Sequence, residues 1–131
     1  MPKVFISYST KDTAFAARLE RLLHDGMIGF LDHSDIAAGA SLSGLIREEM
    51  NGASAVLVLL SEDAVKSNWV PFEIGLAQAL GKPIIPILLP ASDLDESALD
   101  LVKGYRVIDA RKKPIQQVAE EINSALELQP A

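Results

Sequence analysis

The sequence predicts an α/β domain built on an open five-stranded parallel sheet, with helices covering both faces of the sheet. Short apolar runs alternate along the chain with segments in which apolar residues recur every three or four positions. Residues 55–60 are apolar without alternation, which is typical of a strand buried on both faces. A chain of 131 residues is large enough for one such domain with one hydrophobic core.

Apolar runs bounded by turn residues predict five strands, at residues 4–6, 28–31, 55–60, 84–89 and 105–108. Pro86 interrupts the fourth run, which favours an edge strand or a bulge at that point. Helical spacing of apolar residues predicts helices near residues 15–23, 42–50, 67–80 and 115–126. The segment 91–104 has no clear pattern.

Capping residues support two of these helices. Ser9 and Asp12 have the spacing of a capping box at the start of the first helix. Ser67 is placed to cap the third helix, and Gly81 is placed to end it. Pro71 then falls in the first turn, where its missing N–H does no harm.

Composition excludes several classes of function. The chain has 12 basic and 18 acidic residues, a net charge of −6, so a general nucleic-acid binder is not expected. It has no cysteine, which rules out disulfides, thiolate metal ligands and a cysteine nucleophile and suits the cytoplasm. Neither a membrane span nor a signal peptide is recognisable, and we expect a cytoplasmic protein that does not bind membranes.

The common motifs of α/β enzymes are missing. The sequence contains no G-x-G-x-x-G, no G-x-x-x-x-G-K-[ST] and no G-x-S-x-G. A phospho-receiver domain would need carboxylates after the first and third strands, but serines stand there. His24 and His33 do not form a plausible triad or metal site, and no metal is expected.

Parallel α/β sheets bind ligands beyond the carboxyl ends of their strands. That edge should carry residues 7–10, 32–40 and 61–67, together with the start of the helix that holds Trp69. Trp69 and Glu73 are four residues apart and share a helix face, so a flat apolar side chain would lie beside a carboxylate. The alternative is that Trp69 packs on the sheet and Glu73 is a solvated surface residue.

Three segments resemble the signature regions of the TIR (Toll/interleukin-1 receptor) domain family. They are VFISYS at residues 4–9, the loop with Asp32 and Gly39, and SNWVPFEI at residues 67–74. Their order and spacing agree with the family, and the resemblance covers essentially the whole chain. It implies the family's flavodoxin-like five-stranded fold. Ala38, Val70 and Ser9 depart from common family residues, and this makes the sequence similar to bacterial TIR domains.

Many members of this family cleave NAD⁺ between nicotinamide and ribose, so the resemblance implies an NAD⁺ glycohydrolase. It places the catalytic glutamate on Glu73 and the substrate-binding residues on Tyr8, Ser9, Thr10, Asp32, Gly39 and Trp69. NAD⁺ is then the substrate, and no separate cofactor is expected. Each binding residue has a simpler alternative: Tyr8 packs, Ser9 caps a helix, Asp32 forms a turn and Gly39 adopts a positive φ.

The resemblance also implies partners. We expect residues 1–131 to form a single TIR domain. Because family enzymes assemble with other TIR domains, we also expect this domain to act in such an assembly. This domain would be brought together by a sensor domain in the same chain or in a partner, in bacterial immune defence. Lys11 and backbone N–H groups are candidates to hold a pyrophosphate. Two alternatives remain open: an adaptor that acts only through TIR–TIR contacts, and a mimic of host TIR signalling.

Overall fold

A computed structural model describes residues 4–23 and 42–127 of the chain. Its elements, in chain order, are β1 (Val4–Ser7), η1 (Thr10–Asp12), α1 (Thr13–Leu22), α2 (Leu42–Asn51), β2 (Ala55–Leu60), α3 (Glu62–Lys66), α4 (Trp69–Ala79), β3 (Ile84–Leu88), α5 (Glu96–Leu99), η3 (Asp100–Val102), β4 (Ile108–Asp109), η4 (Ala110–Lys112) and α6 (Ile115–Glu127).

The predicted α/β fold is confirmed. The described strands form one sheet in the order β1-β2-β3-β4, and every neighbouring pair is parallel. The strand expected at residues 28–31 lies outside the described residues. The strand expected at residues 105–108 is shorter and begins later, because only Ile108 and Asp109 pair with β3. The preceding Tyr105 and Val107 instead pack against the apolar residues on the α4 side of the sheet.

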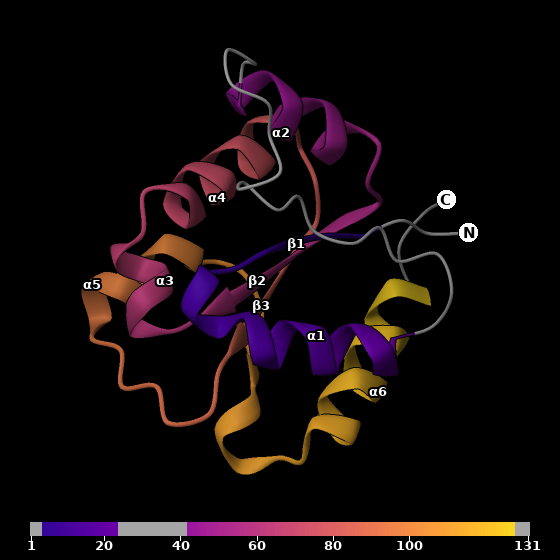
Figure 1. The fold of residues 1–131 in the computed structure, drawn as a ribbon, viewed down its shortest axis with the longest axis vertical. Helices are drawn as coiled ribbons and strands as arrows, with labels where there is room; N and C mark the ends of the chain where they lie inside the picture. The colour runs from indigo at the N-terminus through magenta and orange to yellow at the C-terminus, as the bar shows by residue number, and fades with distance from the viewer. Residues whose placement is uncertain (1–3, 24–41, 128–131) are drawn as a thin grey trace.

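Helices cover both faces of the sheet, as Figure 1 shows: α1 and α6 lie on one side, and α2 and α4 lie on the other. The period of two along β1 explains how one strand serves both layers. Val4 and Ile6 belong to the apolar cluster under α1 and α6, whereas Phe5 belongs to the cluster under α2 and α4. All six residues of β2 are buried, as a strand between two helical layers requires.

Pro86 does not lie on an edge strand or at a bulge, so that prediction is wrong. It lies in register opposite Val58 in β3, which is an inner strand between β2 and β4. The bonds from Val56 N–H to the Pro83 carbonyl and from Leu89 N–H to the Leu60 carbonyl show that odd-numbered residues of β3 face β2. Pro86 therefore directs its nitrogen, which carries no hydrogen, toward the β4 side, where pairing begins only at Ile87.

The end of α4 confirms the expected role of Gly81. The Gly81 N–H donates to the Gln78 carbonyl at 3.1 Å, and the Lys82 N–H donates to the Ala77 carbonyl at 3.0 Å. This pair of bonds is a Schellman motif, and Gly81 has the φ of 69° that the motif requires. Within the described ranges, no helix is both long and apolar enough to span a membrane.

The carboxyl ends of β1 and β2 lead into η1 and α3, which contact each other at one end of the sheet (Figure 1). The first turn of α4 follows α3 directly, and α5 lies at the same end. This end, the carboxyl edge, is where a parallel α/β sheet is expected to bind its ligand.

Candidate functional site

The centre of the candidate site is a buried carboxylate on α4. The Glu73 side chain is only 2% exposed, and the Ser7 hydroxyl at the end of β1 donates a hydrogen bond of 2.6 Å to its Oε1. Ser7 itself is 1% exposed. Ser7 lies two residues after Phe5 in β1, so the two side chains point to the same face of the sheet, the one covered by α4. The simpler alternative of a solvated glutamate is therefore wrong.

Burial changes the protonation of this carboxylate. Desolvation raises the pKa of Glu73 to about 7, and the hydrogen bond from Ser7 opposes part of that rise. Both protonation states are accordingly populated near neutral pH. A carboxyl group with this property, at the carboxyl edge of a parallel sheet, is a candidate for catalysis or charge stabilisation.

Trp69 lies one helical turn before Glu73, as predicted. It is half-buried, packs against the apolar cluster on the α4 side, and meets the Phe72 ring edge-on with centroids 5.8 Å apart and planes at 84°. Phe72 is 39% exposed and extends this aromatic surface toward solvent. The prediction that Trp69 shares a helix with Glu73 is confirmed, and its packing on the sheet side also holds.

Ser67 sets the position of this helix start. Its hydroxyl accepts a hydrogen bond of 3.1 Å from the Val70 N–H and donates one of 2.8 Å to the Ala64 carbonyl. The expected cap is thus present, and the same side chain joins the end of α3 to the beginning of α4. Trp69 and Glu73 are held on the first turns of a helix that is fixed at its amino end.

The turn after β1 contains three of the predicted substrate-binding residues, Tyr8, Ser9 and Thr10. Tyr8 is half-buried and packs against the cluster on the α1 side. The Ser9 hydroxyl accepts from the Lys11 N–H at 3.3 Å, and the carbonyl of exposed Thr10 accepts from the Thr13 hydroxyl at 2.6 Å. These contacts agree with the simpler role of Tyr8 in packing, and Ser9 caps the short helix η1. The capping box expected from Ser9 and Asp12 at the start of α1 is wrong, because the Asp12 carboxylate accepts a hydrogen bond from Ser61 instead.

The Lys11 ammonium lies 3.5 Å from an Asp63 carboxylate oxygen, at the exposed carboxyl edge. Asp32 and Gly39 lie outside the described residues. The structure therefore brings Tyr8, Ser9 and Thr10 to the strand end where Ser7 contacts Glu73.

Sequence reasoning missed Ser7 as a partner of Glu73. The signal for it was present in the alternation of β1, since a polar residue two positions after Phe5 must point to the same face. A polar side chain at such a buried position needs a partner, and α4 covers that face. Sequence reasoning also missed the bond between Ser61 and Asp12, in which the hydroxyl donates to Oδ2 at 2.5 Å.

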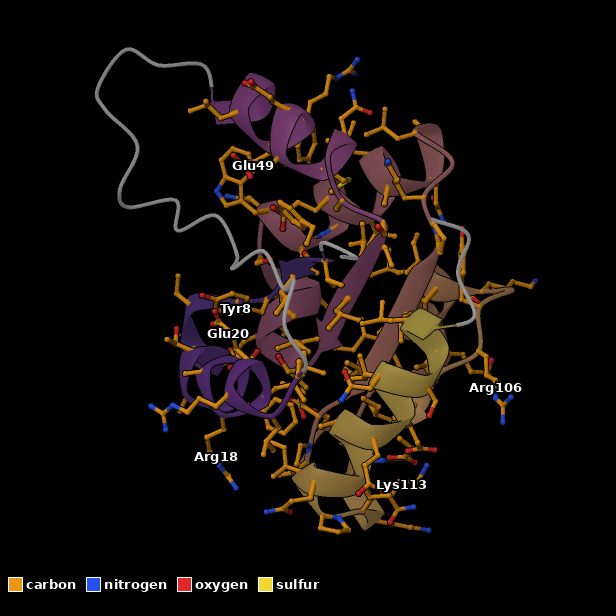
Figure 2. The ribbon with its side chains drawn as sticks, turned by 90° about the vertical axis from the view of Figure 1, so that its right-hand side faces the viewer. Tyr8, Arg18, Glu20, Glu49, Arg106 and Lys113 are labelled. Carbon is orange, nitrogen blue, oxygen red and sulfur yellow. The ribbon has the colours of Figure 1, made fainter. Side chains whose placement is uncertain are left out.

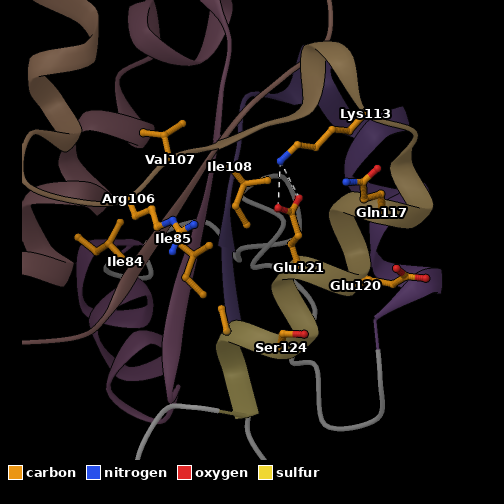
Figure 3. Close-up of a pocket in the computed structure, with 11 residues that line it drawn as sticks. Ile84, Ile85, Arg106, Val107, Ile108, Lys113, Gln117, Glu120, Glu121 and Ser124 are labelled. Carbon is orange, nitrogen blue, oxygen red and sulfur yellow. Dashed lines mark hydrogen bonds and ion pairs between the residues drawn. The ribbon is translucent and has the colours of Figure 1, made fainter.

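A second concave feature lies elsewhere on the molecule. A groove of about 650 Å³ runs between α6 and the outer part of the sheet, with Ile85 and Ile108 on its floor. Arg106 and the ion pair between Lys113 and Glu121, 2.9 Å apart, line its rim (Figure 3). Figure 2 places Tyr8 on one side of the molecule and Arg106 and Lys113 on the other, so this groove is separate from the Glu73 site.

The fold and the site together define a single-sheet α/β domain with a buried carboxylate at its ligand edge. The family model of the TIR domain matches residues 4–128. The chain belongs to the TIR domain family. Among the described residues, no group of three or more histidine, aspartate or glutamate side chains could hold a metal ion.

Relatives in sequence and in structure are distant. The uncharacterized protein y4lF of Sinorhizobium fredii is 30% identical over 103 residues, which cover 71% of this chain and 32% of that protein. The chain thus spans about a third of that relative's length. The TIR domain of the Toll-related receptor TRR-2 from Hydra magnipapillata has 22% identity and a TM-score of 0.69, covering 95% of this chain and 97% of that chain.

A second similar structure is the CMP N-glycosidase BcmB of Clostridium botulinum. Its TM-score is 0.66 at 16% identity, and the match covers 94% of this chain and 98% of that chain. At such low identities, the two structural matches show a shared fold.

Proposed function

We propose that this TIR domain is an NAD⁺ glycohydrolase in which Glu73 is the catalytic residue. The observation that carries the proposal is the buried Glu73 carboxylate at the carboxyl edge, bonded to the end of β1 and one helical turn from Trp69. The glutamate four residues after the tryptophan in the third signature segment is the feature that distinguishes enzymatic TIR domains from adaptors.

The chemistry suits a single carboxylate. In NAD⁺ the bond between ribose C1′ and the nicotinamide nitrogen breaks, and the bonding electrons leave with nicotinamide, which becomes neutral. Positive charge develops on the ribose as an oxocarbenium-like species, which a nearby carboxylate stabilises. Water then adds to C1′ and releases a proton, giving ADP-ribose. An adenine nitrogen of the same molecule can replace the water, giving a cyclic product.

Two further points support this reaction class. One neighbour of the same fold is named a CMP N-glycosidase, and its reaction also breaks an N-glycosidic bond of a nucleotide. The aromatic surface of Trp69 offers a wall for a flat nicotinamide or adenine ring. Tyr8, Ser9, Thr10, Asp32 and Gly39 complete the proposed contacts with NAD⁺, which is the substrate, so no separate cofactor is invoked.

Activation by assembly is part of the proposal. A carboxylate that is 2% exposed must become accessible before it can touch ribose, so the isolated domain should turn over NAD⁺ slowly. Contact with other TIR domains, driven by a sensor domain in the cytoplasm of a bacterial cell, would provide the active arrangement. Immune defence is the proposed setting.

The test uses the domain fused to a chemically inducible dimerisation tag. NAD⁺, and CMP in a parallel reaction, are incubated with the clustered and unclustered protein, and products are separated by chromatography and identified by mass. We expect clustering to increase nicotinamide release at least tenfold, and Glu73→Gln to abolish it.

Exposed Glu48 on α2 provides a matched control, and Glu48→Gln should retain wild-type turnover. Turnover of NAD⁺ that survives in Glu73→Gln would contradict the mechanism. A folded, clustered wild-type domain without turnover would favour the adaptor function. Turnover of CMP in place of NAD⁺ would reassign the substrate.

A further inference from the structure

The contact between Ser7 and Glu73 joins two buried polar groups that are 66 residues apart in sequence. A buried hydroxyl or carboxyl group without a partner costs free energy, so each member of this pair stabilises the placement of the other. A pair of apolar side chains could fill the same space between β1 and α4 without this cost. The polar pair therefore indicates a role other than packing.

The local structure leaves the Ser7 hydroxyl with little freedom. Ser7 lies in the parallel ladder opposite Val58, so its backbone is fixed by β2, and its side chain is on the face covered by α4. A glutamate carboxyl group, in contrast, rotates easily about its last bond, because that torsion has a broad energy profile. A donor on the rigid strand, 2.6 Å from Oε1, restricts that rotation.

We propose that Ser7 is a positioning residue, whose hydroxyl holds one oxygen of the Glu73 carboxylate against the end of β1, so that the carboxylate is already oriented when assembly opens the site to the substrate ribose. This inference rests on the proposed function. Ser7 acts through Glu73 and has no contact of its own with NAD⁺ in this account. The same hydrogen bond favours the ionised form of Glu73 and lowers its pKa against the opposing effect of burial.

The test separates positioning from a merely structural contribution. Ser7→Ala removes the donor, and Ser7→Thr retains it. Ser92→Ala is a matched control, since Ser92 is also buried and its hydroxyl donates to the Leu60 carbonyl at 3.4 Å, away from Glu73. Urea unfolding establishes that each variant is folded. If a variant of Ser7 does not fold, Ser7→Cys takes its place, because cysteine has nearly the same volume as serine and is only a weak donor.

The first measurement does not depend on turnover. The carboxyl ¹³C resonance of Glu73 is followed by NMR from pH 4 to pH 9, with assignment from Glu73→Gln. We expect the midpoint to rise by about one pH unit in Ser7→Ala and to stay near the wild-type value in Ser7→Thr and Ser92→Ala. An unchanged midpoint in Ser7→Ala would overturn the proposal.

The second measurement is the steady-state rate of NAD⁺ cleavage by the clustered protein. We expect Ser7→Ala to lower kcat by roughly 10- to 100-fold with less than a threefold change in KM, and the pH–rate profile to move in the same direction as the NMR midpoint. Ser7→Thr should recover most of kcat. Equal losses in Ser7→Ala and Ser92→Ala would also overturn the proposal.

The two measurements keep the failures of the two proposals distinguishable. A wild-type protein that never cleaves NAD⁺, but whose Glu73 midpoint responds to Ser7→Ala, would refute the proposed function and still support control of the Glu73 carboxylate by Ser7. Cleavage that proceeds normally in Ser7→Ala would leave the proposed function intact and refute the positioning role.

Discussion

The hydroxyl of Ser61 donates a 2.5 Å hydrogen bond to Oδ2 of Asp12, and so joins the turn after β1 to the turn after β2. The same hydroxyl accepts from the Ala64 N–H at 3.1 Å and caps α3. The pKa of Asp12 is raised above its ordinary value. Burial is the largest cause and the charge of Asp63 adds to the rise, whereas the bond from Ser61 opposes it. One side-chain pair thus fixes two of the loops at the carboxyl edge.

Asp12→Ala should therefore destabilise the protein. It removes the acceptor and leaves the Ser61 hydroxyl without that bond, so we expect a loss of about 1–3 kcal/mol in the free energy of unfolding, measured by urea denaturation. Asp63→Ala is the control, because it removes a more exposed ion pair with Lys11 and should cost under about 1 kcal/mol. Equal losses in the two variants would contradict this account.

Glu73→Gln should stabilise the fold at alkaline pH while it abolishes activity. Because burial raises the pKa of Glu73 from 4.5 to about 7, its contribution to stability is fully present below pH 4.5 and is lost as the pH rises through 7. Glutamine stays neutral and can still accept from Ser7. We expect the variant to be more stable than the wild type by about 3 kcal/mol at pH 9.

Urea denaturation of both proteins from pH 4 to pH 9 measures this difference. The exposed Glu48→Gln variant should follow the wild-type pH dependence at every point. Parallel curves for Glu73→Gln and the wild type would show that Glu73 is not buried with a raised pKa in solution.

Trp69 provides a direct probe of ligand binding, because it is the single tryptophan in the chain. We expect NAD⁺ to change its fluorescence in the Glu73→Gln background, where no turnover intervenes. Trp69→Ala should raise KM for NAD⁺ about tenfold, since stacking on an aromatic face contributes roughly 1–3 kcal/mol per base. Phe72→Ala removes only the edge-on partner, 5.8 Å away, and should change KM less than threefold.

Gly81 and Gly75 form a matched pair for helix α4. Gly81 has a φ of 69°, so Gly81→Ala should lower the free energy of unfolding by about 1–2 kcal/mol through backbone strain alone, because no atom lies within 4 Å of an added Cβ. Gly75 lies inside the helix with the same open space. Gly75→Ala should raise stability by about 0.5–1 kcal/mol. Thermal unfolding of the two variants measures these changes, and we expect Gly81→Ala to unfold at a lower temperature than the wild type and Gly75→Ala at a higher one.

The long buried elements could be predicted from sequence, since their patterns directly reflect burial. The unbroken apolar run of β2 and the one-sided apolar face of α6 admit few alternative structures. The short helices α3 and α5 were not predicted, because four or five residues show no periodicity. Their capping residues, Ser61 and Asp95, were the available signals, as each accepts a bond from the third residue of its helix.

The candidate site was predicted in part. Trp69 and Glu73 could be found because helical spacing puts them on one face of a single element. Ser7, the partner of Glu73, is brought to it by the packing of α4 on β1. The alternation along β1 indicates the face of Ser7, but local spacing does not identify a partner 66 residues away. A serine at a strand end also looks like a simple terminator. The folded chain shows that this serine is buried and donates its hydrogen bond to Glu73.

Pro86 has a consequence for how molecules of this protein meet in concentrated solution. Although β3 is an inner strand, among the described residues β4 pairs with it only from Ile87 onward, so residues 84–86 have no described strand beside them on that side. The missing N–H of Pro86 removes a donor that a docking strand would need there. Pro86→Val restores this donor, and we expect it to scatter more light at high concentration. We therefore expect Pro86 to disfavour the addition of a strand from another molecule at this position.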